Sequence, residues 1–190
     1  MSDSRGSGTL AASLFPSPVG ALLAVVEESG ALRRLEFARG RTRAQIEAEL
    51  AGGPPVEWDD GRCGSVERQL EEYFTRQRRA FELPLHLLGT PFQLRVWHEL
   101  QRIPYGHAVT YGDLARRLGN PRSVRAVGHA NGANPIAIVV PCHRVVGASG
   151  KLVGYGGGLD IKRFLLEWEG ARPPGLPEAG RNGEQGSLFG

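Results

Sequence analysis

The residue pattern of this 190-residue chain changes at Gly89, and that change limits the folds open to it. Short β-rich runs separated by turn residues come first, and they predict a small sheet with hairpin-like connections. These runs cover residues 10–15, 21–26 and 31–37. Helical spacing follows at 42–50 and 65–74. After Gly89 the pattern is one of helices and loops, so the sequence predicts an α+β fold. The predicted parts are a supporting α+β domain at 1–88, a mainly helical domain at 89–170 and a flexible tail at 171–190.

Capping residues mark the helices of the second half. Thr90 and Pro91 form a cap and a first-turn proline, which predicts a helix over 91–102. The last helix is predicted over 159–169, because its apolar residues recur at helical spacing. Its expected buried residues are Ile161, Phe164, Leu165 and Trp168.

Two shorter helices are predicted between these, over 111–118 and 122–131, and Thr110 caps the first of them. The tight turn Gly119-Asn120-Pro121 that joins them is typical of a helix-turn-helix motif. An ordinary helical hairpin with solvated arginines has the same local pattern, so both interpretations stay open.

The charge is unevenly distributed along the chain. Residues 90–170 hold ten Lys and Arg against five Asp and Glu, whereas the remainder holds 13 against 15. A basic half beside a mildly acidic half favours a polyanion-binding module next to a supporting one. No run of about 18 apolar residues exists, and the first ten residues lack the features of a signal peptide. We therefore expect a cytoplasmic protein without a membrane partner.

The chain has two cysteines, Cys63 and Cys142, and is long enough to bury a core without disulfides. Cys63 lies in a turn-rich stretch with no His at metal-ligand spacing, so we interpret it as an incidental thiol and expect no metal site. The glycines at 154–158 do not match a phosphate-binding loop, and we expect no cofactor.

Cys142 follows a strand-like apolar run, 136–140, and stands beside His143 and Arg144. A thiolate is the nucleophile, and nearby bases or positive groups make a cysteine reactive. Neighbouring side chains on an extended segment point to opposite sides, so contact between Cys142 and His143 requires a turn, which Pro141 favours.

Five motifs in order carry a family resemblance. They are Gly119-Asn120-Pro121, Arg125-Ala126-Val127-Gly128, Asn134-Pro135, Pro141-Cys142-His143-Arg144-Val145, and Tyr155 with its glycines. Over about residues 90–170 the chain closely resembles the O6-alkylguanine-DNA alkyltransferases, the methylated-DNA–protein-cysteine methyltransferases. The first domain matches only in size and coarse pattern. The resemblance implies DNA repair by irreversible alkyl transfer from O6-alkylguanine in double-stranded DNA, with O4-alkylthymine left open.

The resemblance also implies catalytic roles. Cys142 would be the alkyl acceptor, His143 the base that reaches it through a water molecule, and Glu169 the carboxylate that holds His143. Asn134 would brace the helix-turn-helix against the active-site segment, and Tyr111 would donate a proton to guanine N3. The nearby Glu167 is an alternative to Glu169.

Contacts with DNA and the lesion are implied as well. The family places the second helix of the motif in the minor groove, with Arg125 filling the gap left by a flipped nucleotide. The implied DNA-binding residues are Thr110, Arg122, Ser123, Arg125, Ala126 and Gly128. The implied substrate-binding residues are Pro141, Val145, Tyr155, Gly156 and Gly157. Some members carry Ser at the position of Gly156, and some have a zinc site in the first domain that has no counterpart here.

Three other functions compete with repair. A helix-turn-helix regulator with Cys142 as a sensor would need an effector domain, and alkyltransferase-like lesion sensors replace the acceptor cysteine. A Cys/His hydrolase would regenerate its thiol. Separately, residues Gln185-Gly186-Ser187-Leu188-Phe189 resemble the peptide by which bacterial repair proteins bind the sliding clamp, which makes that clamp an expected partner.

Overall fold

The computed structural model describes residues 8–172, and it confirms the α+β fold class. These residues form two compact units that divide between Leu88 and Gly89. The segment resembling a clamp-binding peptide, at 185–189, lies outside the described residues.

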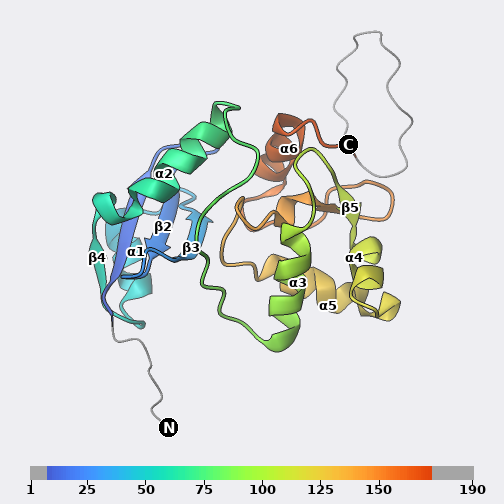
Figure 1. Cartoon of the computed structure of the whole chain (residues 1–190), viewed down its shortest axis with the longest axis horizontal. Coiled ribbons are helices and arrows are strands. Elements are labelled where there is room, and N and C mark those ends of the chain that lie inside the picture. The colour runs from blue at the N-terminus through green and yellow to red at the C-terminus, as the bar shows by residue number, and fades with distance from the viewer. Residues whose placement is uncertain (1–7, 173–190) are drawn as a thin grey trace. The chain divides into compact units, whose positions relative to one another are not determined.

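The first unit is built on a four-stranded sheet in the order β3-β2-β1-β4 (Figure 1). The strands are β1 (Leu10–Phe15), β2 (Leu22–Val26), β3 (Leu32–Phe37) and β4 (Val56–Trp58). The first three form the two antiparallel hairpins that the turn residues predict. β4 pairs parallel to β1, which requires a crossover connection. A three-residue strand is too short to show alternation, and the sequence did not indicate it.

The helices α1 (Arg43–Leu50) and α2 (Asp60–Phe74) pack on opposite faces of this sheet. Ile46 of α1 packs with Leu10 and Ala12 of β1. Ser13, which points to the other face of β1, donates to Asp60 at the start of α2 (2.7 Å). Both faces of the sheet are therefore covered.

The residues around Cys63 predict a turn-rich loop, but the structure places Cys63 near the start of helix α2. Asp59 caps that helix by accepting a hydrogen bond from the Arg62 backbone (3.1 Å), so the helix begins five residues earlier than predicted. The Cys63 thiol is buried against the Ala11 carbonyl, and burial raises its pKa to about 11. A thiol in this state is a weak nucleophile.

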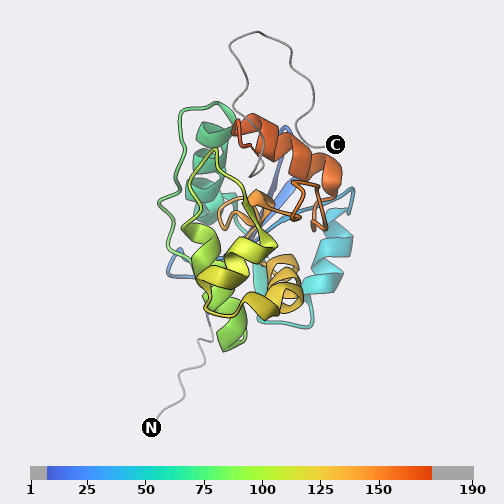
Figure 2. The same cartoon turned by 90° about the vertical axis from the view of Figure 1, so that its right-hand side faces the viewer.

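The second unit is mainly helical, and three of its helices lie together in both views (Figures 1 and 2). These are α3 (Pro91–Gln101), α4 (Tyr111–Arg117) and α5 (Val124–Gly132). The predicted caps Thr90 and Thr110 both form capping boxes. The Trp97 indole of α3 donates to the Ala130 carbonyl of α5 (2.8 Å), which joins these two helices.

The two predicted short helices are present, with one difference in the second. Gly119, in the left-handed region at φ +77°, follows the last turn of α4. The next turn, η1 (Pro121–Ser123), is a 3₁₀ helix, and only from Val124 does the chain become α-helical. Asn120 is responsible, because its side chain accepts from the Arg122 backbone (3.2 Å) and its carbonyl accepts from Ser123.

The remaining elements of this unit are β5 (Val109–Thr110), η2 (Cys142–Arg144), β6 (Val145–Val146) and α6 (Leu159–Trp168). The strand predicted over 136–140 is wrong: the segment is a series of turns, and Ile138 adopts φ +68°. Asn134 causes this, because its side chain bonds the backbone at both Ile136 and Val140 and replaces the bonds of a strand ladder.

No helix within residues 8–172 combines the length and apolar character needed to cross a membrane.

Candidate active site

Cys142 begins a single 3₁₀ turn, η2, that directly follows Pro141. The predicted turn is therefore present, and it buries Cys142, His143 and Arg144 together. The next two residues form β6, whose parallel pairing with β5 fixes the turn beside the start of α4. η2 also contacts α3 and α6, so four elements hold the thiol in place.

Asn134 contacts the reactive sulfur directly. Its Nδ2 lies 3.0 Å from Cys142 Sγ and 2.8 Å from the Val140 carbonyl, and its Oδ1 accepts from the Ile136 backbone at 3.1 Å. The sequence assigned this residue to bracing two segments. The structure shows that it also supplies a hydrogen-bond donor to the sulfur, which favours the thiolate over the thiol.

His143 and Glu169 form a buried pair, with His143 Nε2 3.0 Å from Glu169 Oε1. Glu167, the alternative carboxylate, is exposed on α6. The other ring nitrogen, His143 Nδ1, is buried and has no hydrogen-bond partner among residues 8–172. One side of the imidazole is thus fixed, and the other can accept a proton.

Arg144 completes this group. Its position in the sequence indicates a positive group near Cys142, whereas the structure pairs it with Glu169. Its Nε donates to Glu169 Oε2 at 2.8 Å and its Nη2 to Oε1 at 2.9 Å, a two-point contact that fixes the carboxylate plane. Its Nη1 donates to the Ile103 carbonyl at 2.6 Å. Gly106, at φ +76°, adds a longer backbone contact to Glu169 Oε2 (3.4 Å).

Burial and charge set the protonation states of this group. Burial lowers the pKa of His143, and this outweighs the nearby carboxylate, so the imidazole is neutral at neutral pH. Burial opposes ionisation of Glu169, but His143 and Arg144 outweigh it and hold the carboxyl pKa well below its usual range. The arrangement is a neutral base anchored to a carboxylate whose charge Arg144 balances.

The Cys142 thiol itself is strongly affected by burial, which raises its pKa. The hydrogen bond from Asn134 and the positive charge of Lys162 oppose that rise. The thiol therefore depends on its neighbours for activation.

Lys162 is fully buried in α6 and donates to the carbonyls of Val153 (2.8 Å) and Gly154 (3.4 Å). Burial lowers its pKa to about 8, while the Cys142 thiolate raises it. Its ammonium lies 5.8 Å from the centre of the Tyr111 ring. One of the ten basic residues counted at 90–170 thus lies inside the unit.

Tyr111 is the first residue of α4, after the Thr110 cap, and its hydroxyl donates to the Val153 carbonyl at 3.3 Å. Burial and the Cys142 thiolate raise its pKa to about 12, and a hydrogen bond from Asn131 opposes the rise. Tyr111 is therefore protonated at neutral pH and close enough to Cys142 to sense its charge.

Comparison with known proteins agrees with this geometry. Residues 91–171 match the family model described as the DNA-binding domain of 6-O-methylguanine DNA methyltransferase, and residues 10–87 match its ribonuclease-like domain. The chain belongs to this family. It is 45% identical over 160 residues to the methylated-DNA–protein-cysteine methyltransferase of Methanosarcina acetivorans, covering 83% of this chain and 97% of the relative.

Solved structures of the methyltransferase family share the fold. The crystal structure of Mycobacterium tuberculosis OGT in complex with DNA is 42% identical, with a TM-score of 0.73, and covers 85% of this chain and 92% of that chain. The crystal structure of the O6-methylguanine-DNA methyltransferase of Pyrococcus kodakaraensis is 32% identical, with a TM-score of 0.58. The match covers 85% of this chain and 99% of that chain.

Five of the six residues that the family resemblance assigns to DNA lie in α5 and in the η1 turn before it. Arg122, Arg125 and Ala126 are exposed, and Ser123 and Gly128 are half-buried. Gly128 also approaches the site, since a Cβ there would stand 4.0 Å from the Tyr111 ring. The part of α5 that carries Gly128 therefore adjoins Tyr111. Thr110 differs from the others, because its side chain is engaged in capping α4.

The residues assigned to the substrate flank η2 or lie in the glycine loop that follows it, and they differ in exposure. Pro141, Val145 and Gly157 are buried, and Tyr155 is half-buried. Gly156 is exposed, and a Cβ there would meet nothing within 4 Å. The space that a Ser occupies in some members of the methyltransferase family is thus open here.

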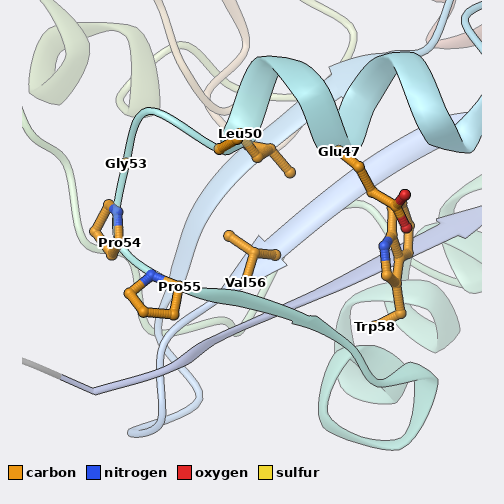
Figure 3. A pocket seen from close by; sticks show the side chains of 8 residues that line it. Glu47, Leu50, Gly53, Pro54, Pro55, Val56 and Trp58 are labelled. Atoms are coloured by element: carbon orange, nitrogen blue, oxygen red, sulfur yellow. The ribbon is translucent and has the colours of Figure 1, made fainter.

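A separate hollow in the first unit lies between the end of α1 and β4 (Figure 3). Its walls include Leu50, Pro55 and Val56, and Glu47 and Trp58 lie at one end. The Arg43 guanidinium stacks 4.3 Å from the centre of the Trp58 ring and pairs with Glu47. None of the residues that line this hollow is a Cys, Ser, Thr, His or Lys. Within residues 8–172, no three His, Cys, Asp or Glu side chains are grouped to hold a metal ion.

Sequence reasoning missed that Asn131 and Lys162 are buried in the site. It also missed that Arg144, indicated only as a positive group near the thiol, is buried against Glu169. Arg and Lys are mostly exposed in proteins, so a surface position was the natural expectation for both. One signal was available for Lys162, because it falls two helical turns before Glu169 and hence on the same face of α6. Asn131 carries no comparable signal.

Proposed function

We propose that this chain repairs DNA by transferring the alkyl group of O6-alkylguanine to Cys142, once per molecule. The observation that carries the proposal is the contact of Asn134 Nδ2 with Cys142 Sγ, beside the buried His143–Glu169–Arg144 group. A buried sulfur with a hydrogen-bond donor and an anchored neutral imidazole is equipped for nucleophilic attack.

Proton removal from the thiol comes first. His143 Nδ1 accepts the proton through a water molecule, and the imidazolium that forms is stabilised by Glu169 on the opposite ring nitrogen. The positive charge of Lys162 stabilises the thiolate that remains. Glu169 stays ionised throughout, so it stabilises the imidazolium once His143 holds the proton.

Alkyl transfer then forms the bond between sulfur and the alkyl carbon as the bond from that carbon to guanine O6 breaks. The electron pair of the broken bond moves into the guanine ring. Tyr111 gives its hydroxyl proton to N3, so guanine leaves as a neutral base, and the phenolate recovers a proton from the imidazolium by way of solvent. The product is a thioether, which no group in this site can cleave, and each molecule reacts once.

The target base must leave the duplex to reach a buried sulfur, at a cost of a few kcal/mol of unstacking. The exposed face of α5 binds the minor groove, and its small residue Ala126 suits that narrow groove. Arg125 fills the space that the flipped nucleotide leaves. Phosphate contacts from Arg122 and Ser123 give binding without base preference that weakens with salt.

The experiment is a titration of the protein with duplex DNA carrying O6-methylguanine, with unmodified guanine counted as product. We expect one guanine restored per protein molecule, without turnover, and none with Cys142→Ser. More than one product per molecule would favour a hydrolase, and DNA binding without any product would favour a regulator or lesion sensor.

The sliding clamp is proposed as a partner through Gln185–Phe189, on the sequence pattern alone. Leu188 and Phe189 are the residues that a hydrophobic groove would receive. Deleting 185–190 is expected to abolish clamp binding and leave alkyl transfer intact. Unchanged clamp affinity would remove this partner.

A further inference from the structure

Asn131 is a buried polar side chain that lies between the proposed nucleophile and the proposed proton donor. It is in the last turn of α5, is 3% exposed, and shares a buried helix face with Val127 and Ala130. Its Nδ2 lies 3.4 Å from the Tyr111 hydroxyl oxygen and 3.4 Å from the Cys142 carbonyl oxygen. Its Oδ1 has no hydrogen-bond partner among the described residues.

The Cys142 carbonyl identifies which end of the amide faces the site. Exchanging the nitrogen and oxygen of Asn131 would set Oδ1 against that carbonyl oxygen, and two acceptors cannot form a hydrogen bond. The amide group of Asn131 is therefore the donor in both contacts.

This polarity restricts the hydroxyl of Tyr111. A hydroxyl has one hydrogen to donate, and its oxygen already accepts from Asn131. The hydroxyl hydrogen must point away from Asn131, and it donates to the Val153 carbonyl at the start of the glycine loop. A base that entered beside this loop would meet Tyr111 as a donor.

We infer that Asn131 is a positioning residue that keeps the Tyr111 hydroxyl directed at the leaving base and stabilises the charge left on its oxygen. This inference rests on the proposed function. The hydrogen bond from Asn131 lowers the pKa of Tyr111 against the effect of burial, as expected for a contact that stabilises the phenolate. An unpaired buried acceptor such as Oδ1 destabilises a fold, so packing alone gives no reason for an asparagine here.

The first test compares two reactions of the same thiol in Asn131→Leu. Transfer from free O6-methylguanine base needs a proton on the leaving group, whereas alkylation by iodoacetamide releases iodide and needs none. We expect the first rate to fall roughly 3- to 10-fold, the effect of one lost hydrogen bond, and the second to stay unchanged. Gln101→Leu, an exposed amide-to-leucine change in α3, is the matched control and should change neither rate. An equal fall in both rates would overturn the inference.

The second test is a double-mutant cycle with Tyr111→Phe. Asn131→Leu should add no further loss of transfer from the free base once the Tyr111 hydroxyl is gone. The same fold-loss in both backgrounds would contradict the role of Asn131 while leaving Tyr111 as the donor. If Tyr111→Phe transfers at the normal rate, the donor role of Tyr111 and this inference both fail, but Cys142 remains the acceptor.

Asn131→Asp provides a second variant of the same shape. A carboxylate accepts the Tyr111 hydrogen instead of donating to its oxygen, which reverses the polarity of the contact. The quantity compared is the ratio of the rate with the free base to the rate with iodoacetamide. We expect this ratio to be lower in Asn131→Asp than in Asn131→Leu. A ratio equal to that of the unchanged protein would overturn the inference.

Discussion

Arg144 donates two hydrogen bonds to the carboxylate of Glu169, at 2.8 and 2.9 Å, and the same carboxylate accepts from His143. All three side chains are buried. Arginine alone can bind both oxygens of a carboxylate in one plane, so Arg144 determines where Glu169 stands and thereby how the His143 ring is turned. The orientation of the His143 ring thus depends on Arg144, which acts through Glu169.

Arg144→Met should destabilise the protein by about 3–5 kcal/mol, because it leaves Glu169 buried without its counter-charge. Arg144→Lys keeps the charge but loses the two-point contact, so its stability should lie between those of Arg144→Met and the unchanged protein. Urea unfolding at pH 7 measures both. Arg102→Met removes an exposed pair with Glu99 and is the control, with an expected change below about 1 kcal/mol. A similar change in Arg102→Met and Arg144→Met would contradict this account.

Asn134→Ala should move the alkylation of Cys142 by iodoacetamide to higher pH. The variant removes a donor to the sulfur, so the already raised pKa of the thiol rises further. The rate at pH 7 should therefore fall, and the rate at high pH should approach that of the unchanged protein. Asn120→Ala, in the turn after α4, is the matched control. A pH profile that does not move would show that the contact has no effect on the thiolate.

Lys162 should make stability depend on pH in the alkaline range. Its pKa is about 8 in the folded protein and near 10.4 in an unfolded chain, so the unfolded state binds more protons between these values. Stability contributed by this group therefore rises with pH across that range, by about 1–3 kcal/mol. The test compares Cys142→Ser with Cys142→Ser/Lys162→Met, so that the thiol does not titrate. Parallel pH dependences of stability in the two proteins would refute this contribution of Lys162.

Arg125→Ala should slow repair of duplex DNA without slowing transfer from the free base, because only the duplex needs a flipped nucleotide. Arg122→Ala should weaken duplex binding and reduce its salt slope by about one. Arg163→Ala, an exposed residue of α6, serves as the control. Equal losses with duplex and free base in Arg125→Ala would indicate a role in the site itself.

Local signals in the sequence predicted much of the fold. β1 has the predicted bounds, and the caps at Thr90 and Thr110 begin helices where expected, because each depends on residues close in the chain. The segment 136–140 was mispredicted for the same reason. Four of its five apolar residues are buried as expected, but hydrogen bonds from Asn134 fold it into turns, and an apolar run carries no sign of that.

The site was predicted to a similar extent. The motifs located Cys142 and His143, and distance separated Glu169 from Glu167, which lies only two residues away. The roles of Arg144 and Lys162 depend on burial, which composition does not reveal. The charge count included both in a polyanion-binding module, whereas the structure pairs Arg144 with Glu169 and Lys162 with backbone carbonyls.

The central claim is that Cys142 is consumed by the lesion. The protein should be incubated with excess duplex carrying O6-methylguanine, and the mass of the intact chain and of its peptides measured. We predict the addition of one methyl group, located on the peptide containing Cys142 and absent from Cys142→Ser, with Cys63 unmodified. Restored guanine alongside a protein of unchanged mass would contradict the account.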